Sequence, residues 1–290
     1  MPRDTSRPPL TRTARFAWGA VAVLLVGVVA LVVYALTDTP VTVRVVHRSA
    51  TPPSVIRSLA TIPTDAFDDV GVTAPGTGLT APTVLAHQPA LSGPGGRPEV
   101  LFVGAEYCPF CAAERWPLVV ALSRFGTFTT LFDMESSDTS VFPGTQTFSL
   151  HGATYDSPYL VFDPVELYSN VPDAHGVYTR IATLSPVQLA LVDRYGAGEG
   201  AVGSMPFVDV DNAVVAPTAG FSPAALARLA QGAIVADLDQ PTTPAGRAIL
   251  ASANYLTAGI CSVTGQRPGA VCSSHGVRTA DAALGLPAGG

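Results

Sequence analysis

Hydrophobic residues are first concentrated near the N-terminus, in an uncharged run of 21 residues from Phe16 to Leu36. About 20 apolar residues span the hydrocarbon core of a bilayer as a helix. Arginines precede this run and Asp38 follows it, so the positive-inside rule predicts a cytoplasmic N-terminus and export of the rest of the chain. A cleaved signal peptide is the alternative, because Val33-Tyr34-Ala35 resembles a cleavage site, although a signal peptide usually has an apolar region of only about 7–15 residues.

This pattern predicts a single-pass protein of the cell membrane with its bulk on the extracytoplasmic side. The predicted parts are a cytoplasmic tail at 1–15, a transmembrane helix at 16–36, a juxtamembrane stalk at 37–53 and an extracytoplasmic domain at 54–290. Residues 134–203 have a less regular pattern and are expected to be an insertion, and residues 240–290 a C-terminal extension. The exported part is long enough to bury a sizeable core.

A strand, a helix and a second strand follow one another in the middle of the chain. Val100 to Gly104 is continuously apolar, as a buried strand is. Cys108 to Phe125 has apolar residues at helical spacing and is followed by Gly126, a typical stop. Thr127 to Asp133 then predicts the next strand, so the segment reads as a βαβ unit with a right-handed crossover.

The C-terminal half alternates shorter strands and helices, which makes the predicted fold class α/β. Its predicted strands are Tyr159–Phe162 and a hairpin of Phe207–Val210 and Ala213–Ala216, joined by a turn at Asp211-Asn212. Its predicted helices start at Ser-Pro or Thr-Pro pairs and cover Ser185–Tyr195, Ser222–Ala233 and Thr243–Ala258.

Charge and composition narrow the function classes. The formal net charge is −6, and the arginines of the N-terminal tail leave the exported part more acidic still. An acidic body without a basic patch gives no support to nucleic-acid binding, which depends on neutralising phosphates. The five histidines are scattered without the spacing of metal ligands, so we expect neither a metal nor another cofactor.

Four cysteines lie in the exported part, an even number that is compatible with two disulfides. Cys108 and Cys111 form a Cys-x-x-Cys pair at the start of the predicted helix, where unpaired backbone N–H groups and the helix dipole favour a thiolate. A reactive pair and an inert structural disulfide are both compatible with this position.

Cys261 and Cys272 lie 11 residues apart across two turn-forming segments. A disulfide closing this loop would stabilise the fold by about 3 kcal/mol. A second redox pair that exchanges electrons with Cys108 and Cys111 is the alternative. A zinc site made of all four cysteines fits less well, because the second spacing exceeds that of a zinc knuckle.

The segment Ala105-Glu106-Tyr107-Cys108-Pro109-Phe110-Cys111 resembles the active site of the thioredoxin superfamily, with Tyr107 where tryptophan is usual. Met205-Pro206, before the predicted hairpin, matches the cis-proline of that fold, although an ordinary trans turn is also possible. Gly104–Trp116, Phe125–Phe128, Pro206–Asp209 and the Cys261/Cys272 pair further resemble an uncharacterised family of thioredoxin-like prokaryotic proteins that are often membrane-anchored.

This resemblance implies a thioredoxin-like fold, with a central mixed sheet flanked by helices, and a thiol–disulfide oxidoreductase activity on a protein partner. Cys108 would be the nucleophile and Cys111 would resolve the mixed disulfide. Met205 and Pro206 would orient the partner chain. Glu106, Tyr107, Pro109 and Phe110 would be their active-site neighbours.

One residue departs from the thioredoxin pattern. Phe102 stands where a buried acid usually assists proton transfer to the second cysteine, so Glu106, Glu114 or water would have to serve. A non-enzymatic binding or scaffold domain, in which the Cys-x-x-Cys pair is only a staple, is therefore the alternative function. The direction of electron flow does not follow from the sequence.

Overall fold

The computed structural model describes residues 25–30, 48–91, 93–173 and 175–286, and its contacts divide the chain into two units, Met1–Thr42 and Val43–Gly290. In the first unit, the described residues 25–30 are helical and exposed. Most of the predicted spanning segment 16–36, and all of the tail 1–15, lie outside the described residues. Within the described ranges, no helix combines the length and the apolar character needed to cross a bilayer.

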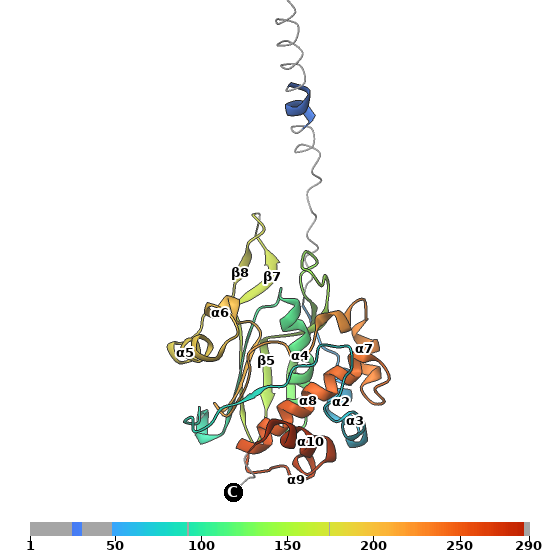
Figure 1. Ribbon diagram of the computed structural model, residues 1–290, viewed down its shortest axis with the longest axis vertical. Helices are drawn as coiled ribbons and strands as arrows, with labels where there is room; N and C mark the ends of the chain where they lie inside the picture. Colours follow the sequence, from blue (N-terminus) through green and yellow to red (C-terminus); the bar gives the residue numbers. More distant parts are fainter. Residues whose placement is uncertain (1–24, 31–47, 92, 174, 287–290) are drawn as a thin grey trace, which may run out of the picture. The chain divides into compact units, whose positions relative to one another are not determined.

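The second unit, drawn in Figure 1, is built around a five-stranded mixed sheet. The strand order is β2-β10-β9-β3-β6. The strands are β2 (Thr83–Val84), β3 (Glu99–Gly104), β6 (Val161–Glu166), β9 (Phe207–Val210) and β10 (Val214–Ala216). β3 pairs in parallel with β6 and antiparallel with β9. The predicted mixed α/β architecture is confirmed in this form.

Two smaller sheets complete the strand set. β1 (Ser49–Ala50), β4 (Thr127–Glu135) and β5 (Gln146–Asp156) form an antiparallel sheet, and β7 (Tyr168–Pro172) pairs with β8 (Tyr178–Arg180). β1 lies in the predicted stalk, so the folded body starts upstream of residue 54.

The predicted βαβ unit is wrong in its second strand. β4 does form, but it pairs with β1 and β5 and not with β3, whose parallel neighbour is β6. The hairpin of β4 and β5 satisfies its own hydrogen bonds and leaves the place beside β3 to a later strand. β6 is an edge strand and contains Pro164, which cannot donate a backbone hydrogen bond.

Helices cover both faces of the five-stranded sheet. The helical segments are α2 (Pro53–Ala60), α3 (Thr64–Val70), η1 (Pro94–Gly96), α4 (Pro109–Leu122), α5 (Pro186–Tyr195), α6 (Gly200–Gly203), η2 (Pro223–Leu226), α7 (Gln231–Asp237), α8 (Pro244–Val263), α9 (Gly269–Cys272) and α10 (His275–Leu284). α4 packs against α8 and β5, and α10 packs against α8 and α3.

Local signals predicted some of these elements well and others poorly. α5 has the predicted bounds, and Ser185 caps it in a capping box with Gln188. The hairpin forms at the predicted place, with Asp211 and Asn212 at positive φ, but the predicted two-residue turn is a three-residue loop, because β10 starts at Val214 rather than at Ala213. The predicted helix 222–233 is wrong: η2 ends at Leu226 and α7 starts at Gln231, with Arg228 at a φ of 63° between them. α8 extends beyond its predicted end at Ala258 to Val263.

Alternation along β3 divides the core into two layers. Val100 and Phe102 face the larger layer, which includes the buried side chains of α4 and α8. Leu101 and Val103 face a smaller layer beneath α5, as expected for successive residues of a strand. Because β3 is buried on both faces, the loop that follows it has a rigid base.

Gly126 joins α4 to β4 at a point where the backbone of β5 comes very close. A Cβ atom there would collide with the carbonyl oxygen of Asp156 and lie 2.7 Å from the ring of Tyr155. We expect Gly126→Ala to destabilise the protein by about 1–3 kcal/mol, as overpacking does, in urea unfolding. Gly232→Ala in α7 is the control, because a Cβ there meets nothing within 4 Å. Equal unfolding midpoints for the two variants would contradict the prediction.

Candidate functional site

The Cys-x-x-Cys pair lies at the N-terminus of α4, directly after the loop that leaves β3. Cys108 is the N-cap residue, and its Sγ accepts a hydrogen bond from the backbone N–H of Cys111 at 3.2 Å. Pro109 occupies the first helical position, where a missing N–H costs nothing. The cap therefore points the sulfur of Cys108 at the electropositive end of the helix.

Cys108 and Cys111 are free thiols in the structure, and their environments differ. Cys111 is fully buried, whereas Cys108 is 9% exposed. A hydrogen bond from the Cys111 thiol lowers the pKa of Cys108, helped by the backbone N–H of Cys111 and by Arg115, although burial opposes them. Burial raises the pKa of Cys111, and the Cys108 charge adds to this. The first thiolate of the pair therefore forms on Cys108.

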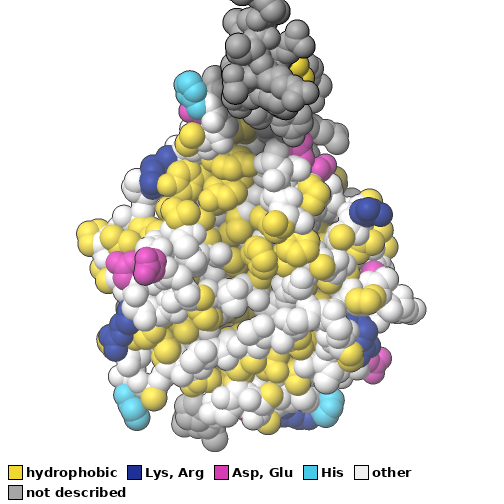
Figure 2. Space-filling model, turned by 45° about the horizontal axis from the view of Figure 1, so that its top comes forward, with side chains coloured by type: hydrophobic (Ala, Val, Ile, Leu, Met, Phe, Trp, Pro, Cys, Tyr) yellow, Lys and Arg dark blue, Asp and Glu magenta, His cyan; other side chains and the backbone are white. Residues whose placement is uncertain are grey.

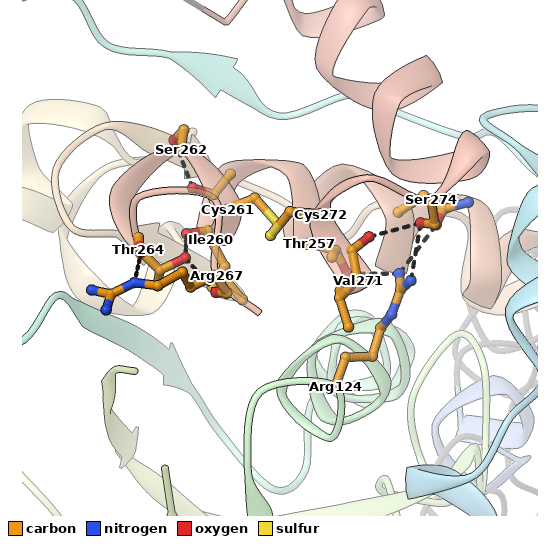
Figure 3. Close-up of a disulfide and its surroundings, with 12 residues drawn as sticks. Arg124, Thr257, Ile260, Cys261, Ser262, Thr264, Arg267, Val271, Cys272 and Ser274 are labelled. Carbon is orange, nitrogen blue, oxygen red and sulfur yellow. Dashed lines mark hydrogen bonds between the residues drawn. A yellow bond between two sulfur atoms is a disulfide. The ribbon is translucent and has the colours of Figure 1, made fainter. Parts of the chain in front are cut away.

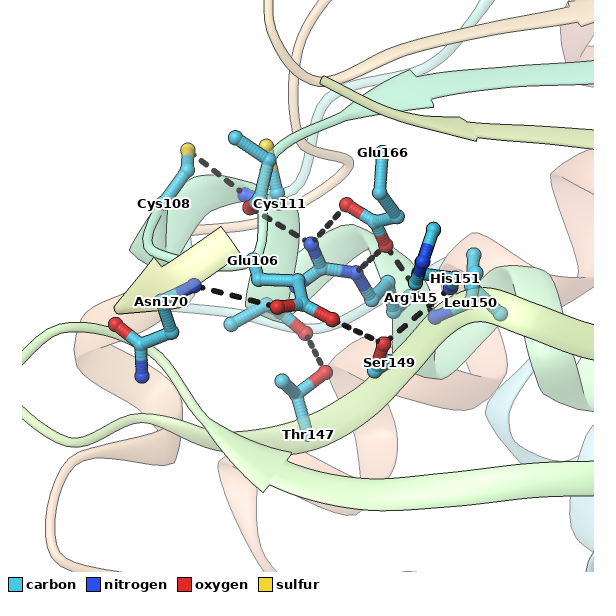
Figure 4. Close-up of polar contacts among 12 residues, drawn as sticks. Glu106, Cys108, Cys111, Arg115, Thr147, Ser149, Leu150, His151, Glu166 and Asn170 are labelled. Atoms are coloured by element: carbon cyan, nitrogen blue, oxygen red, sulfur yellow. Dashed lines mark hydrogen bonds and ion pairs between the residues drawn. The ribbon is translucent and has the colours of Figure 1, made fainter. Parts of the chain in front are cut away.

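A buried ion pair lies beneath the two cysteines, as Figure 4 shows. Arg115 donates from Nε to Oε1 of Glu166 at 2.8 Å and from Nη2 to Oε2 at 2.7 Å. Nη2 also donates to the carbonyl oxygen of Ala105 at 2.7 Å, which ties the guanidinium to the loop before Cys108. Burial alone would lower the pKa of Arg115, but the charge and hydrogen bonds of Glu166, together with the charges of the two cysteines, raise that pKa overall.

Sequence reasoning missed both members of this pair. Arg115 lies four residues after Cys111, on the same face of α4, so its spacing was an available signal. Glu166 is 51 residues away and ends β6, which the sequence analysis placed too early. Only the pairing of β6 with β3 brings its carboxylate under the helix.

The two carboxyl groups that the sequence suggested for proton transfer to Cys111, those of Glu106 and Glu114, accept hydrogen bonds from other residues. Glu106 accepts hydrogen bonds from Ser149 Oγ at 2.5 Å and from the backbone N–H of Asn170 at 3.2 Å. Glu114 accepts from the N–H of Gly220 at 2.7 Å, and burial raises its pKa to about 8. In the described part of the chain, no hydrogen bond joins either carboxylate to a cysteine.

The aromatic ring of Phe102 lies near Cys111, with a cation beside it. Phe102 is fully buried, and a Cβ on Gly104 would contact both its ring and the Sγ of Cys111. The guanidinium carbon of Arg115 lies 5.6 Å from the centroid of the same ring. Cys111 therefore has an apolar ring beside it, and the Arg115 cation lies next to that ring.

Aromatic side chains surround the loop of the cysteine pair. Tyr107 stacks on Tyr178 with a centroid distance of 4.2 Å, and Phe110 meets Phe142 edge-on at 5.8 Å. Burial and the neighbouring Cys108 raise the pKa of Tyr107 to about 12, so its hydroxyl stays protonated. Phe110 is 39% exposed. Apolar side chains gather on the face shown in Figure 2, which brings forward the end of the body where α4 begins and β7 and β8 lie.

Met205 and Pro206 lie beside the end of β3, where the loop to Cys108 starts. The register of β9 pairs Phe207 with Val103, so the dipeptide before β9 runs beside the end of β3. The Met205–Pro206 peptide bond is cis, which confirms that expectation. Met205 is half-buried and packs against both core layers.

A family model described as a domain of unknown function (DUF929) matches residues 87–191. The matched segment contains Cys108, Cys111, Arg115 and Glu166, but neither Met205-Pro206 nor the second cysteine pair. Neither a curated protein nor a solved structure matches the chain.

Cys261 and Cys272 form a disulfide, as predicted, and it joins the end of α8 to α9 (Figure 3). It lies near the C-terminal end of α4, because Arg124, just after that helix, donates to Ser274 Oγ and to Thr257 Oγ1 at 3.3 Å. The Cys-x-x-Cys pair is at the other end of α4, whose 14 residues span about 21 Å. The geometry gives no support to direct electron exchange between the two pairs within one molecule.

The described residues bring together no group of three His, Cys, Asp or Glu side chains that could hold a metal ion. The bonded Cys261 and Cys272 are not free to join Cys108 and Cys111 in a four-cysteine zinc site. What the site can do chemically is therefore set by two unequal thiols, the helix N-terminus and the Arg115 cation.

Proposed function

We propose that this chain is a membrane-anchored, extracytoplasmic thiol–disulfide oxidoreductase with a thioredoxin-like arrangement that acts on a protein partner. The observation that carries the proposal is the asymmetry of the pair: the Sγ of Cys108 caps α4 while Cys111 is fully buried beneath it. The uncharged run at 16–36 supports the anchor and the export. The strand–Cys-x-x-Cys–helix order and the cis Met205–Pro206 bond support the thioredoxin-like comparison.

In the proposed reaction, the thiolate of Cys108 attacks a disulfide sulfur of the partner. The new Cys108–partner bond replaces the partner's disulfide bond, and the displaced partner sulfur leaves as a thiolate that takes up a proton. Cys111 then loses its proton and attacks the Sγ of Cys108, which closes the Cys108–Cys111 disulfide and releases the second partner thiol. The reverse sequence transfers a disulfide to the partner.

Removal of the resolving thiol is expected to trap the partner. In the full chain expressed in its membrane, Cys111→Ser leaves the Cys108 mixed disulfide without an internal attacker, so covalent adducts should accumulate on non-reducing gels and be identified by mass spectrometry. The matched control is the Cys108→Ser/Cys111→Ser double variant, which keeps the fold but lacks the attacking sulfur.

Two results would contradict the proposal. One is an adduct pattern in Cys111→Ser that is the same as in the double variant. The other is a purified Cys108→Ser protein that exchanges disulfides with oxidised glutathione as fast as the unchanged protein. A scaffold domain in which the cysteine pair forms only a structural disulfide would give both results.

A further inference from the structure

Arg115 has one polar atom that the ion pair does not use. Its Nε and Nη2 bind Glu166 and the carbonyl of Ala105, whereas its Nη1 is buried without a hydrogen-bond partner among the described residues. A buried donor without a partner costs about 1–3 kcal/mol, so its presence in a fully buried network requires an explanation. The network of Figure 4 lies directly beneath the cysteine pair.

The charge of the cysteine pair depends on its redox state. The disulfide is neutral, whereas the dithiol form has a thiolate on Cys108 when that sulfur is ionised. In a buried site of low dielectric, a nearby cation stabilises the charged state far more than the neutral one. Arg115 lies one helical turn after Cys111 and binds the carbonyl of Ala105 in the cysteine loop, and its charge favours the thiolate of each cysteine.

We propose that Arg115, held in place by Glu166 and Ala105, is a positioning residue that stabilises the reduced, thiolate-bearing form of the pair and so directs the reaction toward oxidation of partner dithiols. This inference rests on the proposed function and adds the direction of electron transfer, from the partner to the cysteine pair. A couple whose reduced form is stabilised is a strong oxidant. The substrate class is then an exported polypeptide with two reduced cysteines.

The oxidative reaction consists of two successive thiol–disulfide exchanges. A partner thiolate attacks Cys108 Sγ of the Cys108–Cys111 disulfide, and Cys111 leaves with the electron pair and takes up one proton. The second partner thiol loses its proton and attacks the partner sulfur of the mixed disulfide, and Cys108 leaves as a thiolate above Arg115. Two electrons pass to the pair, the partner releases two protons, and one of these goes to solvent. A small-molecule disulfide such as oxidised glutathione regenerates the pair in the assay.

The test measures the equilibrium between the full chain and a glutathione redox buffer. Arg115→Met alone leaves Glu166 buried without its partner, so the main variant is Arg115→Met/Glu166→Met, in which both charges are replaced by apolar side chains. We expect its equilibrium to shift about tenfold toward the disulfide, which corresponds to about 30 mV. The thiolate absorbance of Cys108 should also titrate at higher pH in this variant.

Two further variants separate charge from packing. Arg115→Lys keeps the cation and should retain most of the wild-type equilibrium. Arg124→Met removes a half-buried arginine just beyond the far end of α4 and should leave the equilibrium unchanged. An unchanged equilibrium in the double variant, or an equal shift in Arg124→Met, would overturn the inference.

The redox equilibrium is measured independently of partner trapping. If Cys111→Ser traps a partner but the redox equilibrium is the same in the Arg115→Met/Glu166→Met variant, the inferred direction of electron transfer is wrong and the proposed function stands. If no partner is trapped but the equilibrium shifts as expected, Arg115 tunes the pair and the partner reaction is refuted.

Discussion

Glu114→Gln is expected to remove a large part of the pH dependence of stability between pH 4.5 and 8. Glu114 is fully buried in α4, and burial raises its pKa from 4.5 to about 8, against the opposing hydrogen bond from Gly220. Below pH 4.5 the carboxyl is protonated in both the folded and the unfolded state. Between the two pKa values only the folded state holds the proton, so stability falls as pH rises, by up to ~1.4 kcal/mol per pH unit.

The measurement is the free energy of unfolding in urea at several pH values across this window. The difference between Glu114→Gln and the unchanged protein should grow with pH in favour of the variant and level off above about 8. Asp209, whose pKa burial raises to about 7, gives both proteins a residual slope of the same sign. Glu199→Gln, at an exposed position, is the control and should leave the profile unchanged. A difference that does not vary with pH would refute the assignment.

Breaking the buried ion pair is expected to cost far more than removing it. Arg115→Met leaves the Glu166 carboxylate fully buried, and the N–H of Leu150, at 3.3 Å, is then its only hydrogen-bond donor in the described part of the chain. Such an uncompensated charge destabilises a protein by about 3–5 kcal/mol. Replacing both residues by methionine removes the uncompensated charge and fills the space, so the double variant should unfold at a denaturant concentration close to that of the unchanged protein.

A double-mutant cycle in urea checks this expectation. The cycle consists of Arg115→Met, Glu166→Met and their combination, with the coupling energy taken from the three free energies of unfolding. A combined variant that is as unstable as the sum of the two single variants would show that the residues act independently. The stability result also decides which variant suits the redox measurement.

The accurate sequence predictions were those with a local physical cause. α5 starts at a serine cap followed by proline and ends before Gly196, and the hairpin turn needs two residues that tolerate positive φ. The position of Cys108 at a helix N-terminus follows from the same kind of signal, since the apolar run of β3 precedes it and Pro109 opens α4. The cysteine pair and its adjoining loop could therefore be predicted from the sequence alone.

The incorrect or missing predictions depended on contacts between distant segments. β5 was missed because only Phe148 and Leu150 alternate with polar residues before Gly152 breaks the pattern, and its other positions are mostly polar or small. Its hairpin with β4 then displaced the expected partner of β3. Arg115 and Glu166 read individually as ordinary charges of a surface helix and a strand end. Their burial becomes evident only when the two segments are brought together.

The first described residues of the body lie close to the cysteine loop. The guanidinium of Arg48 is 3.7 Å from the Glu106 carboxylate, two residues before Cys108, and Ser49 starts β1. A force applied to the chain at Arg48 would therefore be transmitted to the loop of the reactive thiols through this salt bridge.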